Sequence, residues 1–365
     1  MTLLPLHELH HELRAEFGVQ DDMEIVLSYG DPRAEYEALT CSAGVWDLSF
    51  RGRICLTGAD RVRLLNGQVT NDVKKLQPGE GCYAALVTAK GKIQADLHVH
   101  ALSEELLLDF EPGLTPALLK RFDHYIVADD VQVVDVAPYY GLISIQGPLA
   151  ATVVGALGLE IELPGPRGSS VKATIPDVGD LYVVRNPRLG SDGVDLYVPT
   201  DGLGMVFDKA VTATRASGGR PVGWNAAEVV RMEAGIPRFG TDMDETNLAP
   251  EAGLETSAIS YSKGCYIGQE VIARIRTYGQ VAKALRGLWL PIDLPALPTK
   301  GDKLVLDSKE VGYITSATAS PRWKQNIALG YVRKECNKPG TQLLLRTQGM
   351  EVPVIVSLLP FTSSS

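Results

Sequence analysis

The C-terminal part of the chain constrains the fold most, because it is a series of short strand-like segments. Six such segments, separated by Pro, Gly and polar residues, follow Lys283: 285–290, 303–306, 311–318, 327–332, 341–346 and 352–358. Short strands at regular spacing are typical of a small barrel or sandwich. The sequence therefore predicts a separate C-terminal β-barrel domain at residues 283–365.

The preceding residues alternate helical and strand patterns. Helical periodicity marks 6–17, 59–66, 118–125, 202–217, 226–233 and 269–276. Strand patterns mark 44–49, 53–58, 81–88, 93–102, 131–136, 141–146, 181–186 and 195–199. A chain of 365 residues is too long for one ordinary core. We therefore expect an α+β core of mixed sheets and helices at residues 1–282, ahead of the barrel.

Charge and cysteine usage exclude several classes of protein. A formal net charge of −9 argues against broad binding to nucleic acid or to an anionic membrane, since both need a basic surface. The five cysteines are scattered and contain no Cys-x-x-Cys pair, so neither a disulfide framework nor a closed zinc site is indicated. No apolar run approaches the length of about 18 residues that spans a membrane. We expect a cytoplasmic protein.

The N-terminal segment contains a literal His-Glu-x-x-His pattern at residues 7–11, within the helix predicted at 6–17. A zinc protease needs both histidines on one helix face, a third ligand and a substrate cleft. Only His98, His100 and His124 remain elsewhere, and the pattern lies at the extreme terminus. We expect a solvated polar helix face here.

A second polar row lies on the strand predicted at 93–102, where Gln94, Asp96, His98 and His100 share one side by the two-residue period of a strand. Such a row is most often a solvated sheet face. It has functional interest only if that face is turned towards a pocket.

The most specific motif is Lys-Gly-Cys-Tyr-Ile-Gly-Gln-Glu at residues 263–270, which runs into the helix predicted at 269–276. Gly264 and Gly268 allow tight turns or close backbone approach. Glu270 is placed to pair with Arg274 at i,i+4. A thiol beside a lysine and near a helix N-terminus ionises readily, and the thiolate is the nucleophile and metal ligand. Spacing alone leaves two interpretations of Cys265 open: a reactive thiolate, or a small hydrophobe in a turn.

These eight residues resemble the signature of the YgfZ family of folate-binding proteins. That family shares its fold with the T-protein of the glycine cleavage system, an aminomethyltransferase, and its members are linked to assembly or repair of iron–sulfur clusters. The resemblance implies a T-protein-like folate-binding core of two intertwined α+β subdomains, one at roughly 50–135. It also implies that Lys263 and Cys265 of the motif are important for the function of the protein.

Further segments resemble T-proteins. Residues 69–73 and 91–97 are similar to two T-protein segments, and the essential aspartate of the second falls on Asp96, whereas Ala95 replaces the aspartate before it. Many YgfZ-type proteins lack the acid at this position, so Asp96 keeps transferase chemistry open. Arg-Met-Glu-Ala-Gly at 231–235 is similar to the stretch whose glutamate binds the pterin ring, which falls on Glu233. Without the resemblance, a helix-terminal ion pair would explain Glu233.

Three functions follow. In the first, a YgfZ-type protein binds tetrahydrofolate and supports iron–sulfur client or assembly proteins through Cys265, with a partner completing the ligand set because one cysteine cannot hold a cluster. In the second, Asp96 stabilises a developing cationic amine in a tetrahydrofolate-dependent aminomethyl or methyl transferase. In the third, the fold is a scaffold that binds another protein. The motif at 263–270 favours the first function.

We therefore expect folate in a central cavity with Cys265 near its mouth. Glu233 and Tyr83 are predicted to hold the pterin, and Asp96 to face the reactive nitrogens. Lys263 and Arg274 are predicted to offer positive charge to the ligand or the thiolate. The roles of Tyr83 and Arg274 rest on residue type and position alone. A metal site at Asp242-x-Asp244 is not expected, since two carboxylates in a loop are commonly turn formers.

Overall fold

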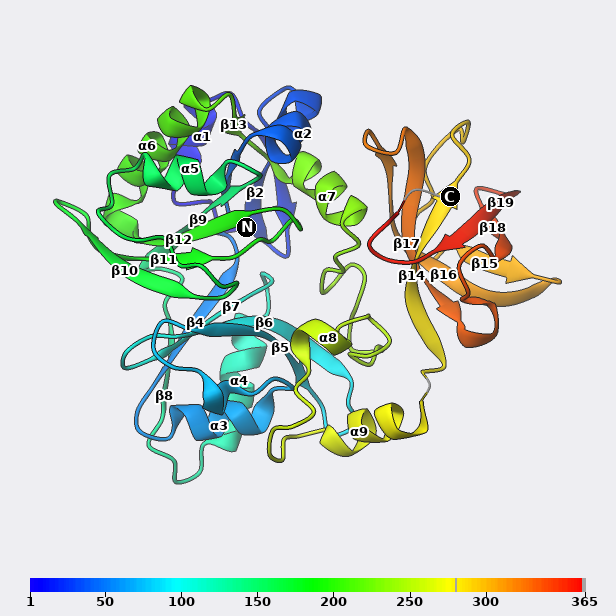
Figure 1. The fold of residues 1–365 in the computed structure, drawn as a ribbon, viewed down its shortest axis with the longest axis horizontal. Coiled ribbons are helices and arrows are strands. Elements are labelled where there is room, and N and C mark those ends of the chain that lie inside the picture. Colours follow the sequence, from blue (N-terminus) through cyan, green and yellow to red (C-terminus); the bar gives the residue numbers. More distant parts are fainter. Residues whose placement is uncertain (280, 363–365) are drawn as a thin grey trace. The chain divides into compact units, whose positions relative to one another are not determined.

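The protein is described by a computed structural model that covers residues 1–279 and 281–362 (Figure 1). The chain divides into two units, which are described in turn. The first comprises Met1–Ala84 and Asp96–Val230, and the second comprises Ala85–Ala95 and Arg231–Ser365. The domain boundaries predicted from the sequence stay predictions.

The first unit begins with α1 (His7–Glu12) and the two-stranded sheet of β1 (Glu16–Gln20) and β2 (Met23–Ser28), followed by α2 (Pro32–Cys41). The helix predicted at 6–17 is therefore wrong in its second half. Arg14 adopts a positive φ of 60°, which ends the helix, and the chain turns into β1.

The histidines of α1 have different environments. His7 bonds Glu24 of β2 at 2.9 Å, and His11 is exposed as expected. His10 is fully buried, where Asp47 bonds its Nε2 at 2.8 Å and the Tyr29 hydroxyl lies 2.9 Å from its Nδ1. His7 and His10 thus tie α1 to the strands around it.

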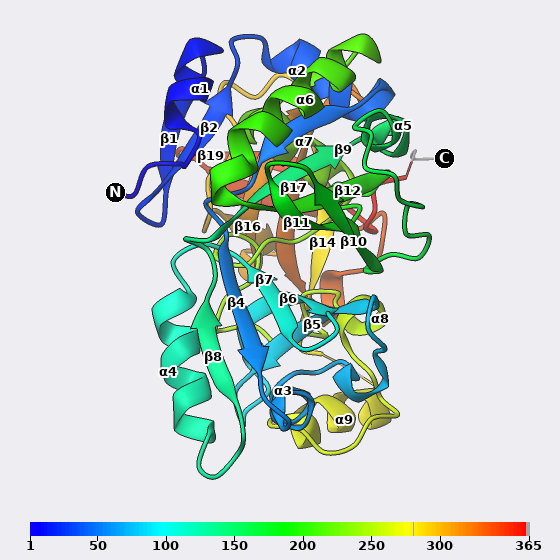
Figure 2. The same ribbon diagram turned by 90° about the vertical axis from the view of Figure 1, so that its left-hand side faces the viewer.

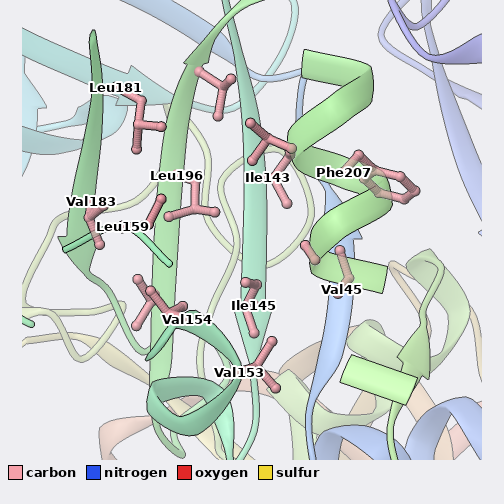
Figure 3. Close-up of a cluster of buried hydrophobic side chains, with 14 of the residues drawn as sticks. Val45, Ile143, Ile145, Val153, Val154, Leu159, Leu181, Val183, Leu196 and Phe207 are labelled. Carbon is pink, nitrogen blue, oxygen red and sulfur yellow. The ribbon is translucent and has the colours of Figure 1, made fainter. Parts of the chain in front are cut away.

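The first unit contains a six-stranded sheet with the order β10-β11-β12-β9-β3-β13. Its strands are β3 (Gly44–Asp47), β9 (Tyr140–Gln146), β10 (Ser170–Ile175), β11 (Gly179–Arg185), β12 (Gly193–Pro199) and β13 (Arg220–Pro221). Helices α5 (Ala150–Gly155) and α6 (Leu203–Ala216) pack on this sheet. Figure 3 shows Val153 and Val154 of α5 among the apolar side chains of its strands, and Phe207 of α6 belongs to the same buried cluster.

The next sheet has the order β5-β6-β7-β4-β8. Its strands are β4 (Gly52–Thr57), β5 (Gly81–Val87), β6 (Ile93–Ala101), β7 (Leu106–Phe110) and β8 (Gln132–Asp135). Helix α3 (Arg61–Gln68) follows β4, and α4 (Thr115–Tyr125) packs on β4 and β8 (Figure 2). The hairpin predicted at 81–102 is confirmed as β5 and β6, whose tip belongs to the second unit.

The second unit contains α8 (Glu255–Ala258), α9 (Gln269–Tyr278) and a closed barrel with the order β14-β17-β16-β15-β18-β19. Its strands are β14 (Lys283–Leu290), β15 (Lys303–Leu306), β16 (Lys309–Ser320), β17 (Gln325–Arg333), β18 (Gln342–Thr347) and β19 (Met350–Ser357). All six predicted strands are present, and the predicted α+β core with a C-terminal β-barrel is the observed architecture. Helix α7 (Trp224–Glu233) begins in the first unit and ends in the second.

In the ranges that the structure describes, no helix has the length and apolar character needed to cross a membrane.

Candidate functional site

The polar row of β6 is not a solvated sheet face. Asp96 and His100 are only 8% and 1% exposed, and His98 is half-buried. Buried polar side chains are retained only where partners compensate their lost hydration. The partners of this row therefore define the candidate site of the first unit.

Asp96 and Tyr83 form the centre of this site. The Tyr83 hydroxyl donates to Asp96 Oδ2 at 2.8 Å. The other oxygen, Oδ1, is buried and has no hydrogen-bond partner in the described part of the chain. Burial and the nearby charge of Glu111 raise the pKa of Asp96 to about 6, although Arg51 and the Tyr83 bond oppose the shift. The two residues predicted from the sequence are thus brought together, with one carboxylate oxygen free to meet a ligand.

Arg51 links this centre to two further carboxylates. Its Nε donates to Asp109 Oδ1 at 2.6 Å, and its Nη1 donates to Glu111. Arg51 is 7% exposed, Asp109 is fully buried and Glu111 is 9% exposed. Arg51 thus bridges two carboxylates with one bond to each, which the several N–H donors of a guanidinium allow.

Arg188 holds the other side of Asp109. Its Nη2 bonds Asp109 and its Nε donates to Asp195 Oδ2 at 2.8 Å. Burial by itself raises the pKa of Asp109, but Arg188 and then Arg51 outweigh it and hold that pKa well below its usual range. Asp195 also accepts bonds from Ser144 at 2.7 Å and Asn186 at 2.8 Å.

These residues form one continuous set of buried charges, which we call the carboxylate network: Arg51, Asp96, Asp109, Glu111, Arg188 and Asp195. Two arginines face four carboxylates. Removing one member of a buried pair leaves an uncompensated charge, so the network is sensitive to any single change. Its excess of carboxylates favours a proton or a positively charged group at Asp96.

His98 lies against the centre of the site, with its ring 5.1 Å from that of Tyr83. Burial, and after it the charge of Arg188, lowers the pKa of His98 well below its usual value. The imidazole is therefore neutral at neutral pH and adds no positive charge beside Asp96.

In the second unit, Glu233 ends α7 and is 4% exposed. Its Oε1 accepts bonds from the hydroxyl of Ser320, which ends β16, and, at 3.2 Å, from the backbone N–H of Arg322 in the turn after that strand. These bonds attach α7 to the barrel. The pterin-binding role predicted for Glu233 stays a prediction beside this structural one.

Asp242 has a structural role in the same unit. Its carboxylate accepts bonds from Arg231 Nη1 at 2.5 Å and from the hydroxyls of Thr315 and Ser316, both at 2.6 Å. Asp244 accepts from the backbone and hydroxyl of Thr246, which makes a turn. In the described ranges, no group of three or more His, Cys, Asp or Glu side chains has the arrangement of a metal site.

The motif loop, residues 263–270, leads into α9. Gly268 has a φ of +82° at the helix N-cap, and a Cβ there would meet the Thr88 carbonyl oxygen at 2.4 Å. This position therefore requires glycine, because of both its backbone angle and its close approach to the β5–β6 turn. Lys263 is 6% exposed, with its ammonium 4.8 Å from the centre of the buried Tyr266 ring.

Cys265 lies in this loop as an exposed, free thiol. This exposure gives the thiol access to a partner, and the two interpretations of Cys265 stay predictions. Arg274 is exposed on α9, and its predicted role towards a ligand or thiolate stays a prediction.

Sequence reasoning missed Arg51, Asp109, Glu111, Arg188 and Asp195. A usable signal exists for two of them. Asp109 interrupts the apolar strand 106–110 and Asp195 interrupts the apolar strand 193–199. A carboxylate within an apolar, fully buried strand needs a buried cation nearby, and such a pairing indicates a polar site.

An α+β body, a closed C-terminal barrel and a buried carboxylate-centred site define the class of this protein. The chain belongs to the glycine cleavage T-protein family: residues 6–263 match the GCVT N-terminal domain, and residues 283–362 match the glycine cleavage T-protein C-terminal barrel domain.

Named relatives span the same length. The chain is 29% identical to a probable aminomethyltransferase of Natronomonas pharaonis over 98% of each protein. It is 28% identical to a putative chloroplastic transferase of Arabidopsis thaliana, over 97% of this chain and 79% of that protein. The solved glycine cleavage system aminomethyltransferase T of Bartonella henselae has the same fold, with a TM-score of 0.88, 24% identity and coverage of 99% and 98%.

Proposed function

We propose that this protein is a tetrahydrofolate-dependent transferase of an aminomethyl or methyl group. The observation that carries the proposal is the buried Asp96 carboxylate, with one oxygen held by Tyr83 and the other without a partner in the described part of the chain. The names of the relatives, which are aminomethyltransferases, support this reaction class over the iron–sulfur role.

The residues fit a ligand that brings a nitrogen to Asp96. An unpaired buried carboxylate oxygen is costly, and an N–H donor or a cationic nitrogen would satisfy it. Tetrahydrofolate would supply the nucleophilic nitrogen that receives the one-carbon unit. Tyr83 fixes the orientation of the carboxylate through its hydroxyl bond.

Asp96 has two tasks in this proposal. As the folate nitrogen bonds to the one-carbon unit, the bond between that carbon and the donor's leaving group breaks, and the leaving group departs with the electron pair. The nitrogen gains positive charge, and a fixed buried carboxylate stabilises that charge. The nitrogen must then lose a proton. A pKa of about 6 lets Asp96 accept that proton near neutral pH.

The first test is binding of tetrahydrofolate and transfer of a one-carbon unit from an aminomethyl donor. We expect Asp96→Asn to retain binding while transfer falls by about 10²–10³-fold, the usual effect of removing one electrostatic group. Tyr83→Phe should have a smaller effect, and the exposed Asp123→Asn is the control. A protein that binds no folate would contradict the proposal and would favour the scaffold function.

Glu233 needs its own test because it also attaches α7 to the barrel. Glu233→Gln and Ser320→Ala both weaken the same hydrogen bond. If Glu233 contacts the pterin, Glu233→Gln weakens folate binding far more than Ser320→Ala does. Equal losses in the two variants would restrict Glu233 to its structural role.

We retain a YgfZ-type role in iron–sulfur cluster assembly or repair as a second candidate. The exposed thiol of Cys265 favours it, because a cluster or a client protein can reach this sulfur. The test is rescue of an iron–sulfur enzyme in cells that lack this gene. Failure of Cys265→Ala alone supports the cluster role, whereas failure of Asp96→Ala alone supports folate chemistry. Cys41→Ala is the control, since Cys41 is also exposed.

A further inference from the structure

The outer face of the barrel contains a pocket of about 230 Å³ in which cationic side chains predominate. Its cations are Lys283, Lys303 and Arg333, and its carboxylate is Glu310. The pocket lies across four neighbouring strands, β14, β17, β16 and β15. On these strands, Lys283 pairs with Arg333, and Tyr313 pairs with both Tyr331 and Lys303. None of these residues has a part in the proposed transferase function.

The charges of this pocket are not balanced. Lys303 and Glu310 approach to 3.8 Å, and both side chains are about half exposed, at 49% and 60%. Such an exposed ion pair contributes little to stability, so Lys303 can leave Glu310 and bind another anion at small cost. Lys283 and Arg333 have no carboxylate of their own among the residues that line the pocket. Outside the lining, Lys283 has Asp244 as an acidic neighbour: burial opposes the shift, but the Thr246 bonds and then the charges of Lys300 and Lys283 lower the pKa of that carboxyl. The lining itself has three cations and one carboxylate, so it retains an excess of positive charge.

Lys283 is held in a fixed position. Its ammonium donates to the Tyr313 hydroxyl at 3.0 Å and lies 4.6 Å from the centre of the Tyr331 ring. An ammonium has three N–H donors, so this bond leaves donors for a ligand. A lysine ordered in this way loses less side-chain entropy on binding than a mobile surface lysine.

Tyr331 supplies the second, independent observation. It lines the pocket, is 1% exposed, and its hydroxyl finds no hydrogen-bond partner within residues 1–279 and 281–362. Burial, followed by the charges of Tyr313 and Asp242, raises the pKa of Tyr331, so the hydroxyl keeps its proton. Unsatisfied buried hydroxyls are rare, and each calls for an explanation.

We propose that this barrel pocket binds a small oxyanion, a carboxylate or a phosphate, with Lys283 and Tyr331 as the inner donors and Lys303 and Arg333 at the rim. The pocket volume of about 230 Å³ is sufficient for a short dicarboxylate or an inorganic phosphate.

The test is calorimetric titration of the full-length protein with sodium phosphate and with sodium succinate, each against sodium chloride at equal ionic strength. We expect at least one of the two to bind above the chloride background, and the arm that binds identifies the chemistry. Heats no larger than those of chloride in both arms would overturn the proposal.

Variants locate the site. Lys283→Met should weaken binding by about tenfold or more, and Tyr331→Phe by about fivefold to tenfold, the value of one hydrogen bond. Lys309→Met is the matched control, because Lys309 is exposed on β16 outside the pocket, and it should change affinity less than about twofold. Equal losses in Lys283→Met and Lys309→Met, or full binding by Tyr331→Phe, would overturn the proposal. If Tyr331→Phe does not fold, the exposed Arg333→Met replaces it, with an expected loss of about fivefold.

Discussion

The carboxylate network of the first unit and the motif loop of the second differ in how their residues are distributed. The network draws its members from positions between 51 and 195, and their side chains are almost completely buried. The motif loop is eight consecutive residues, with its cysteine exposed. The contiguous group is easy to recognise in a sequence, whereas the scattered group has the stronger mutual interactions.

The physical reason lies in where the partners come from. A buried charge needs an opposite charge, and neighbouring strands supply it from distant parts of the chain. The shape of an exposed loop can be set locally, here by the left-handed Gly268. We therefore expect single changes in the network to cost much stability, and changes of the exposed side chains in the motif loop to cost little.

The largest effect should come from Asp109→Asn, which removes the charge between Arg51 and Arg188. Breaking a buried pair costs about 3–5 kcal/mol, so urea unfolding should show a loss of this size. Asp123→Asn on the surface of α4 should change the free energy of unfolding by less than about 0.5 kcal/mol. Similar losses of unfolding free energy in the two variants would contradict the claim that the network stabilises the fold more than surface charges do.

Asp96 should make stability depend on pH. Its folded pKa of about 6 lies above the usual 3.8, so the folded state binds more protons between these values. The free energy of unfolding should therefore fall as pH rises from about 4 to 6, by up to about 3 kcal/mol. Asp96→Asn should lack this contribution in unfolding curves measured across that range. In activity profiles, wild-type transfer should rise with the ionised carboxylate as pH passes about 6.

Gly268→Ala tests the local shape of the motif loop. The positive φ and the close approach to Thr88 should together cost about 1–3 kcal/mol, measured by thermal or urea unfolding. Gly264→Ala is a control within the same motif, since no atom lies within 4 Å of a Cβ built there. If both variants lose the same stability, the loop is less tightly defined than its geometry indicates.

Cys265→Ser should have the smallest effect on stability, less than about 0.5 kcal/mol, because the side chain is exposed. The buried Cys336→Ser is the contrast, since a hydroxyl placed in the apolar cluster of the barrel should cost about 1–3 kcal/mol. Both values come from the same unfolding experiment. A large loss in Cys265→Ser would mean that the motif has a structural role.

The sequence predicted the regular parts of the fold well. The six barrel strands, the β5–β6 hairpin and helices α4, α6 and α9 were predicted because their apolar periods are clear. The pattern at 6–17 failed because periodicity does not register the left-handed Arg14 that ends α1. No element was predicted for β1, β2, α2, β7 or β10. Partial exposure weakens the periodic signal of β1 and β10, whereas β7 is buried throughout and its five residues are too few to show a period.

The candidate site was predicted only in part. Resemblance identified Asp96, and residue type identified Tyr83, and the two form a hydrogen bond. The arginines around them could not be found from local patterns, because their partners lie up to 79 positions away in the chain. The roles predicted for Glu233, Lys263, Cys265 and Arg274 remain to be tested.

The tip of the β5–β6 hairpin has a consequence for how such a protein can be divided. Residues 85–95 belong to the second unit although the flanking residues belong to the first, and the tip supplies Ile93, whose N–H bonds the Asn247 carbonyl at 3.0 Å. A gene fragment that encodes only residues 231–365 would lack this tip and the support it gives to Gly268. Recombination at a single point therefore cannot exchange the second unit intact, and homologous chimeras need the hairpin tip and the C-terminal segment from the same parent.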